Sequence, residues 1–225
     1  MSVLSIILLA ALGITILGSV IGFGTKLILI AVMSLFIDLK AAIFIVAIYS
    51  MVCFLIRIAY FRDHLDRGLA LKMLGFMIPG IAIGLFLFDT LDTGILKLVF
   101  SLFLVGYVVY QVFGLHSRFH LGFLGLGVFV FFFGLLEGAI GAAGPLLACG
   151  LLHYGKKKEG FIVFSAFLFI VSSIIRVGGY AYLNVYDLNI VILLVLPLFA
   201  VAAAGTWLGR HLLKRMHENK DFSVD

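Results

Sequence analysis

Several long apolar runs restrict what this chain can fold into. Five of them are close to the ~20 residues that an α-helix needs to cross the ~30 Å hydrocarbon core of a bilayer, and they lie at about 41–61, 69–88, 94–113, 161–182 and 188–209. Of the 225 residues, 64% are hydrophobic and 12% are charged, whereas soluble domains have about 45–50% and about 25%. The sequence therefore excludes a soluble domain and predicts an all-α, multi-pass (polytopic) membrane protein.

Two further apolar stretches, at about 3–37 and 121–154, are too long for one straight span. Each contains small residues near its middle, Gly22-Phe23-Gly24 in the first and Gly141-Ala142-Ala143-Gly144-Pro145 in the second. Such residues interrupt helices, because glycine costs backbone entropy and proline lacks the N–H that the helix needs. We expect each stretch to form a helix, a break and a shorter second helix.

Basic residues predict the orientation of the chain, because Lys and Arg in short loops favour the cytoplasmic side. They lie between the apolar runs, near the start of one run and in the C-terminal tail, at Arg62, Arg67, Lys72, Arg118, Lys156 to Lys158, Arg210, Lys214, Arg215 and Lys220. We expect the C-terminus in the cytoplasm and the N-terminus outside. The stretch 121–154 is then a hairpin that starts and ends inside, either re-entrant or crossing twice, and 3–37 is a hairpin that starts and ends outside.

Because one hairpin starts and ends inside and the other starts and ends outside, the two halves of the chain have opposite orientations in the membrane. This is the inverted-repeat plan of many secondary transporters. The predicted parts are a first transmembrane repeat at 1–93, a linker helix and loop at 94–120, a second repeat at 121–209 and a basic cytoplasmic tail at 210–225. Each repeat consists of a broken-helix hairpin followed by two spans.

The sequence itself contains a weak internal match between the halves. A shift of 119 residues superposes Arg57 on Arg176, and Pro79 meets Pro197 after a one-residue slip. Arginine is rare inside membranes, and the chain has only 3 prolines. These two pairs therefore support the repeat more than any match of apolar residues.

The two breaks are candidate binding sites. Lipid cannot satisfy the backbone groups that a broken helix exposes, so such breaks persist beside protein or a water-filled cavity. Pro145 suits the first position of a new helix, and the N–H groups and partial positive charge of a helix N-terminus favour an anion. Gly22, Gly24, Gly141 and Gly144 would let the backbone approach that ligand closely. The alternative is that these glycines are helix-packing positions.

Lys26 and Glu137 are charged residues beside the breaks. A charge at the bilayer centre costs at least ~2.5–3.5 kcal/mol on insertion scales, so it usually serves a pathway or a partner. Thr25 and Lys26 open a half-helix, whose positive end would repel the ammonium unless an anion lies there, so we place both in the substrate site. Glu137 is the candidate for a coupling residue that carries a proton. The alternatives are that Lys26 and Glu137 pair with each other, or that Lys26 snorkels.

Arg57 and Arg176 are further candidate ligands of an anion. A guanidinium offers a planar fork of donors that suits a carboxylate, sulfonate or sulfite. Arg176 lies in a run that otherwise reads Ser172-Ser173-Ile174-Ile175, whereas Arg57 lies near the end of its span. The alternative, stronger for Arg57, is that the charged head reaches to the interface while the stem stays in the bilayer.

The sequence does not indicate other classes of site. The 6 histidines lie in loops, at span ends or in the tail and form no H-E-x-x-H pair, so we expect no metal site. We also expect no catalytic residues and no cofactor, because the chain has neither a phosphate-binding loop nor a credible Ser-His-acid set. The net charge of +5 comes mostly from loops and the tail, which leaves no domain to bind nucleic acid.

The pattern of the two breaks resembles the TauE/SafE family of membrane transporters. Each break comes early in its half and is followed by a span and then by a Pro-containing span. The resemblance covers about residues 5–210, and the positions that match the family's glycine-rich segments are Gly22, Gly24, Gly141, Gly144 and Pro145. It implies transport of sulfite, sulfonates or related organosulfur anions.

The chain departs from the family pattern in two ways. Thr25, Ala142 and Ala143 dilute the glycine runs, and the basic segment 210–215 stands where the family has its last helix. The first difference bears on the identity of the substrate. The second implies either a shortened member or a homo-oligomer that covers the gap.

The sequence thus leads to the hypothesis of a secondary transporter in the plasma membrane, that is, the inner membrane of a bacterium or archaeon. It would move a small anion coupled to a proton or a sodium ion. The alternatives are an anion channel and an integral membrane protein without transport activity, such as an assembly factor or an enzyme.

Overall fold

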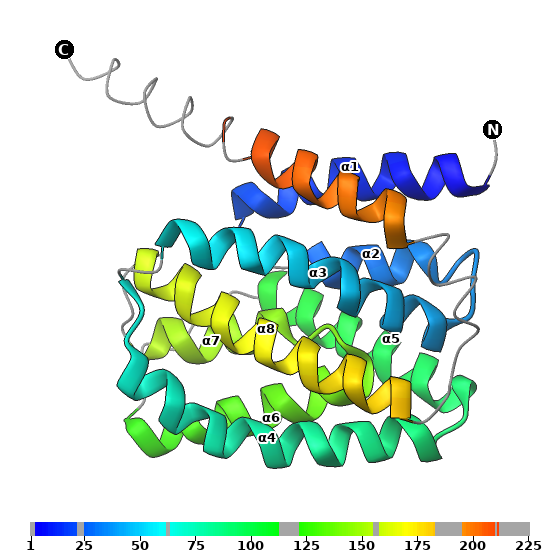
Figure 1. Ribbon diagram of the computed structural model, residues 1–225. Helices are drawn as coiled ribbons and strands as arrows, with labels where there is room; N and C mark the ends of the chain where they lie inside the picture. Colours follow the sequence, from blue (N-terminus) through cyan, green and yellow to red (C-terminus); the bar gives the residue numbers. More distant parts are fainter. Residues whose placement is uncertain are drawn as a thin grey trace.

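The computed structural model describes residues 3–21, 25–61, 64–112, 122–154, 158–182, 195–209 and 211, and helices are the only regular secondary structure within these ranges. The labelled helices in Figure 1 are α1 (Val3–Ile21), α2 (Thr25–Met33), α3 (Leu39–Phe61), α4 (Arg67–Thr90), α5 (Thr93–Val112), α6 (Phe123–Ile140), α7 (Gly144–His153) and α8 (Lys158–Tyr182). Residues Val195–Gly209 form a further apolar helix, which we call the C-terminal helix.

The all-helical, multi-pass architecture predicted from the apolar runs is confirmed. Within the described residues, four helical segments are long and apolar enough to cross a membrane: Leu39–Ile56, Arg67–Thr90, Phe123–Ile140 and Gly160–Tyr180. The run predicted as a linker is also a helix, α5, of 20 residues. Of the run predicted at 188–209, the described part is the C-terminal helix. The assignment of loops to the inside or outside of the membrane stays a prediction.

Both predicted hairpins consist of a long helix followed by a short one. The 19-residue α1 is followed by the 9-residue α2, and the 18-residue α6 by the 10-residue α7. The first break, residues 22–24, lies outside the described residues. At the second break Gly141 adopts a left-handed conformation with φ 73°, and its N–H donates to the carbonyl oxygens of Leu136 and Glu137. Glycine accommodates this conformation without the steric cost of a Cβ atom, so the break is encoded at this position.

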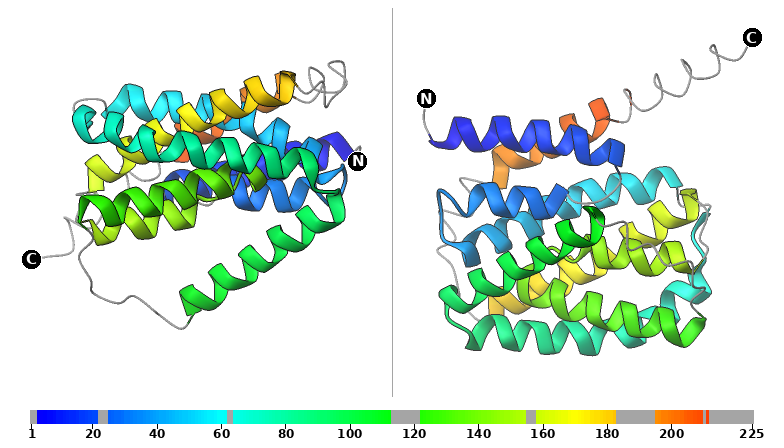
Figure 2. Two further views of the ribbon diagram at one scale, coloured as in Figure 1. Left: turned by 90° about the horizontal axis from the view of Figure 1, so that it is seen from below. Right: turned by 180° about the vertical axis from the view of Figure 1, so that it is seen from behind.

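The helices form layers on either side of a central group (Figure 1). α1 and the C-terminal helix, coloured blue and orange, lie on one side, α4 and α6 lie on the other, and α2, α3, α7 and α8 lie between them. Figure 2 shows that α5 diverges from this body along much of its length. The inner face of α6 and the helices α2, α3 and α8 of the central group meet near the middle of the molecule.

α4 and α6 approach so closely that only glycine fits at their contact. A Cβ atom on Gly84 would lie 2.2 Å from the Leu135 carbonyl oxygen, and one on Gly134 would lie 2.4 Å from the Met77 carbonyl oxygen. The glycines of this contact are therefore helix-packing positions. Small residues at four-residue spacing have this role in many membrane helices.

α3 and α8 run antiparallel through the centre. Their side chains pair in the order Phe44 with Tyr180, Ser50 with Ser173, and Phe54 with Phe169. The shift of 119 residues makes Ser50 equivalent to Phe169 and Phe54 equivalent to Ser173. The contact between Ser50 and Ser173 is therefore equivalent to the contact between Phe169 and Phe54. Two equivalent antiparallel helices that cross about a two-fold axis repeat each contact in this way. The crossing therefore supports the predicted inverted repeat.

The inverted repeat and its boundaries stay a prediction, which the crossing of α3 and α8 supports.

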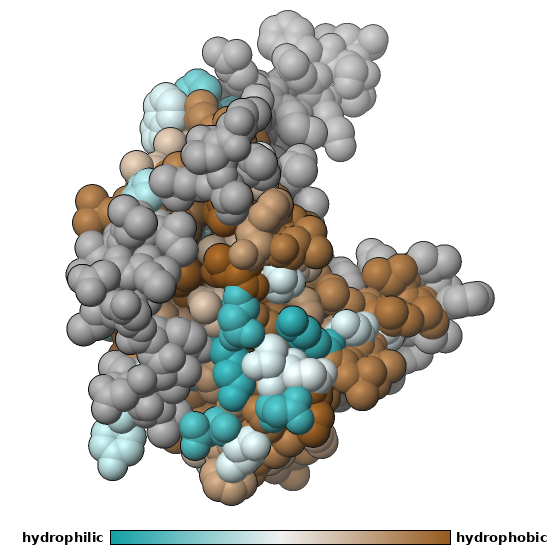
Figure 3. Space-filling model, turned by 90° about the vertical axis from the view of Figure 1, so that its right-hand side faces the viewer, coloured by the Kyte–Doolittle hydropathy of each residue, from teal (hydrophilic) through white to brown (hydrophobic). Residues whose placement is uncertain are grey.

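The end of the molecule where α4 passes into α5 is hydrophilic. Figure 3 shows polar residues gathered there beside hydrophobic surface. Asp89, Thr90 and Asp92 are exposed at this end, while the flank of α4 exposes Ile78, Ile83 and Phe86. Apolar flanks that end in polar caps are what a lipid-embedded helix requires.

Candidate functional site

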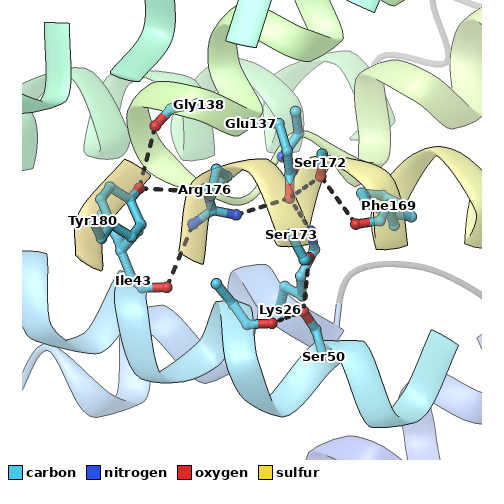
Figure 4. Close-up of polar contacts among 12 residues, drawn as sticks. Lys26, Ile43, Ser50, Glu137, Gly138, Phe169, Ser172, Ser173, Arg176 and Tyr180 are labelled. Carbon is cyan, nitrogen blue, oxygen red and sulfur yellow. Dashed lines mark hydrogen bonds and ion pairs between the residues drawn. The ribbon is translucent and has the colours of Figure 1, made fainter. Parts of the chain in front are cut away.

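Three charged side chains meet in the interior of the helical body. Lys26 of α2 is 6% exposed, and Glu137 of α6 and Arg176 of α8 are each 0% exposed. They are the buried charged residues within the described part of the chain. Figure 4 shows them converging between α3 and α6. The two residues singled out beside the breaks and one of the two arginines are therefore brought together.

Glu137 is the centre of this cluster. Its Oε1 accepts hydrogen bonds from Lys26 Nζ and from Arg176 Nη1, the latter at 3.0 Å. Its Oε2 accepts from the Ala143 N–H at 3.1 Å, and the Ser172 hydroxyl lies 3.5 Å from Oε1. The alternative that Lys26 and Glu137 pair with each other is confirmed. The anion expected beside the Lys26 ammonium is thus the Glu137 carboxylate of the protein itself.

The break after α6 explains how one carboxylate reaches the start of α7. Glu137 lies in the last turn of α6, and the left-handed Gly141 reverses the chain so that the Ala143 N–H points back at it. The Ala143 carbonyl accepts from the Leu147 N–H at 3.2 Å as the first turn of α7 forms. The N-terminus of α7 therefore has an anion, the side chain of Glu137, as its partner. This arrangement suits the partial positive charge of a helix N-terminus.

Arg176 ties the cluster to three helices. Its Nη2 donates to the Ile43 carbonyl of α3 at 3.4 Å, and its Nε donates to the Tyr180 hydroxyl at 3.4 Å. The Tyr180 hydroxyl in turn donates to the Gly138 carbonyl at 3.3 Å. The guanidinium is thus held by contacts with α3, α6 and α8 rather than reaching towards the membrane surface. The snorkelling alternative is therefore wrong for Arg176.

The Lys26 ammonium also lies against two aromatic rings. Its Nζ is 4.0 Å from the ring centroid of Phe169 and 5.4 Å from that of Phe54. These two rings stack on each other with centroids 4.8 Å apart. The ring faces attract the cation and exclude water from it. The cation therefore has a partner both in Glu137 and in the π-system.

The other predicted site residues have different outcomes. Gly141, Gly144 and Pro145 are buried at the second break, and Thr25 is partly buried at the start of α2. A Cβ atom on Gly141 would lie 2.4 Å from Arg176 Nη2, so that glycine makes direct room for the cluster. Gly22 and Gly24 lie outside the described residues. The backbone of Arg57 belongs to α3, but its side chain is not among the parts of the protein that the structure describes.

Sequence reasoning missed three polar residues of the cluster, Ser50, Ser172 and Tyr180. Ser172, Arg176 and Tyr180 are spaced by four residues on α8, which places them on one helical face. That spacing could have predicted that Ser172 and Tyr180 lie beside Arg176. Ser50 has no such signal, because its contact with Ser173, at 3.5 Å between hydroxyl oxygens, depends on the crossing of two distant helices.

The comparisons with known proteins name one family. No curated protein and no solved structure matches the chain. The family described as sulfite exporter TauE/SafE matches residues 7–222. This match covers nearly the whole chain and includes every helix that contributes to the charged cluster. The protein therefore belongs to the TauE/SafE family of membrane transporters.

Proposed function

We propose that the protein is a secondary transporter of small sulfur oxyanions, such as sulfite or organic sulfonates, and that the substrate binds at the charged cluster. The observation that carries the proposal is the cluster's charge. Lys26 and Arg176 are two buried cations, and Glu137 is one buried carboxylate. One positive charge therefore remains without a counter-charge among the buried residues described. Such a charge within a bilayer is costly and is met by a partner.

The donors at this place suit an oxyanion with several oxygen atoms. The cluster combines a guanidinium, an ammonium, the N–H at the start of α7 and the Ser172 hydroxyl, and the Ser50–Ser173 hydroxyl pair lies beside it (Figure 4). A planar guanidinium and a helix N-terminus both favour multi-oxygen anions. The sulfite and sulfonate groups match this geometry, and the family name supports a sulfur oxyanion.

The helices around the cluster support transport rather than static binding. Two broken-helix hairpins and the antiparallel crossing of α3 and α8 meet at one point, which is where inverted-repeat transporters hold their substrate. We place Gly22, Gly24 and Thr25 at the first break and Gly144 and Pro145 at the second break in the substrate site. Arg57 is a further candidate, at the position that the repeat makes equivalent to Arg176.

Glu137 is the proposed coupling residue. It is the buried acidic side chain within the described residues, and it contacts both cations of the site. Replacement by Gln should leave exchange of bound substrate intact and abolish flux driven by a pH gradient. If a sodium gradient alone drives flux in the wild type, the coupling ion is sodium and Glu137 has another role.

The remaining parts of the proposal concern the setting of the protein. We place it in the plasma membrane, the bacterial or archaeal inner membrane, with the C-terminus in the cytoplasm because of the basic tail.

Flux of radiolabelled sulfite into proteoliposomes tests the function. A transporter gives saturable uptake and counterflow, an anion channel gives conductance without counterflow, and a protein without transport activity gives neither. Lys26→Met and Arg176→Gln should each reduce uptake at least tenfold. Lys97→Met and Arg67→Gln are matched controls, because both side chains are exposed and lie outside the cluster. Equal losses in a variant and its control would contradict the proposed site.

A further inference from the structure

The Glu137 carboxylate uses the same donors that a substrate anion would need. Arg176 Nη1, Lys26 Nζ and the Ala143 N–H all donate to it, and the Ser172 hydroxyl is within reach. An external anion cannot receive these hydrogen bonds while the ionised carboxylate keeps them. Two negative groups on one set of donors would also repel each other in a dry interior.

We infer that the Glu137 carboxylate occupies the anion site as an internal ligand, and that a dianionic oxyanion replaces it there as Glu137 takes up one proton. This inference rests on the proposed transport function. One proton from water adds to a Glu137 carboxylate oxygen, the carboxyl group becomes neutral, and the released N–H donors bind the oxygens of the substrate. No covalent bond to the substrate forms or breaks.

The charge of the cluster selects the class of ligand. With Glu137 ionised, the cluster has one positive charge in excess, and with Glu137 protonated it has two. A dianion then neutralises the site completely. A dianion that arrived without a proton would leave one net negative charge at the same place, so the proton and the dianion are taken up together.

The surroundings of Glu137 allow the carboxyl group to stay in place when it becomes neutral. The Ser172 hydroxyl is 3.5 Å from Glu137 Oε1 and 3.0 Å from the Phe169 carbonyl oxygen. It can donate to the carboxylate, or it can donate to the Phe169 carbonyl and accept from a protonated carboxyl. Ser172 therefore provides a partner in both protonation states of Glu137.

The charged and titratable groups that face Glu137 are Lys26 of α2 and Arg176 and Tyr180 of α8. The elements packed against α6 present apolar residues or backbone. α4 contributes Met77, Gly80, Ile81 and Gly84, and the start of α7 contributes the Ala143 N–H. From α5, Leu96 and Phe100 belong to the same buried apolar cluster as Ala139 and Ile140 of α6. Glu137 is the one carboxylate in this set, so a proton taken up with the anion is assigned to it.

Proton uptake on sulfite binding tests the inference. Purified protein in lipid nanodiscs is mixed with sulfite at an alkaline pH, where sulfite is the dianion, and a pH indicator reports proton uptake. The wild type should take up one proton per sulfite bound, and its affinity should fall about tenfold per unit rise in pH. Glu137→Gln should bind sulfite more tightly than the wild type, with no proton uptake and no dependence on pH in this range.

Asp92→Asn is the matched control, because Asp92 is an exposed carboxylate at the start of α5, and it should keep the uptake of one proton. If Glu137→Gln fails to fold with two unpaired cations, the double variant Lys26→Met with Glu137→Gln replaces it. It should bind sulfite more weakly, because Lys26 is absent, and should take up no proton per sulfite bound. Binding without proton uptake in the wild type would overturn the inference, as would equal uptake in the variants, which would mean that bisulfite itself binds. A wild type that neither binds nor transports sulfite would instead contradict the proposed function.

Discussion

Replacing Gly141 by alanine tests whether the second break positions the charged cluster. Two costs can be estimated from the structure. A left-handed backbone at φ 73° costs a non-glycine residue roughly 1–2 kcal/mol. The new Cβ atom would also lie 2.4 Å from Arg176 Nη2, so the guanidinium must move away from Glu137, and a hydrogen bond between charged groups contributes about 1.5–3 kcal/mol. The expected loss in the free energy of unfolding is therefore about 2.5–5 kcal/mol.

Denaturant titration in detergent micelles would measure this loss, and sulfite binding would give a second readout. Gly178→Ala is the matched control, because Gly178 lies on α8 two residues from Arg176 and a Cβ atom there meets nothing within 4 Å. Alanine is favoured over glycine in helices, so this variant should be neutral or more stable by up to about 1 kcal/mol. A Gly141→Ala protein as stable as the wild type would refute the assignment of Gly141 to a left-handed turn against Arg176.

Three further predictions follow from the same cluster and from the predicted topology. Glu137→Gln should lower the free energy of unfolding by about 3–5 kcal/mol and by more than Lys26→Met does, because the first change leaves two buried cations whereas the second leaves the Glu137–Arg176 pair. Denaturant titrations that give the reverse order would contradict this charge count. Gly144→Val should abolish sulfite binding while the purified protein stays monodisperse, and wild-type affinity would make Gly144 a packing residue only. A cysteine at position 157, in Lys157→Cys, should be labelled by an impermeant thiol reagent only from the cytoplasmic side; labelling from outside in intact cells would contradict the inverted topology.

The helices and the second break could be predicted because both depend on local sequence. Long apolar runs gave α3, α4, α5 and α8 to within a few residues, and small residues marked the end of α6. Gly141 is an example, because a glycine after the last apolar turn predicts a helix C-terminus and the structure has one there. The orientation in the membrane depends on how the chain inserts into lipid, which the structure does not contain. It is therefore inferred only from the Lys and Arg residues of the loops.

The site could be predicted only in part, because its contacts join residues that are far apart in the sequence. Lys26, Glu137 and Arg176 were identifiable, since buried charges are rare in an apolar chain. The sequence did not show that these three side chains contact one another, because that contact depends on how α2, α6 and α8 pack. Ser50 and Ser172 were missed because a serine in a membrane helix can satisfy its hydroxyl with its own backbone, as both do here through Ala47 and Phe169.

Under the predicted inverted repeat the two halves differ in charge at equivalent positions, and we propose that this difference determines where an anion binds. The shift of 119 residues places Lys26 of α2 on Pro145 of α7. Glu137 likewise falls on Gly18. One hairpin therefore supplies a cation, and the other supplies free N–H groups together with the carboxylate that uses them. A symmetric pair of hairpins would give two cations or two carboxylates facing each other, which a dry interior disfavours. The asymmetry permits a single site in which an internal and an external anion can alternate.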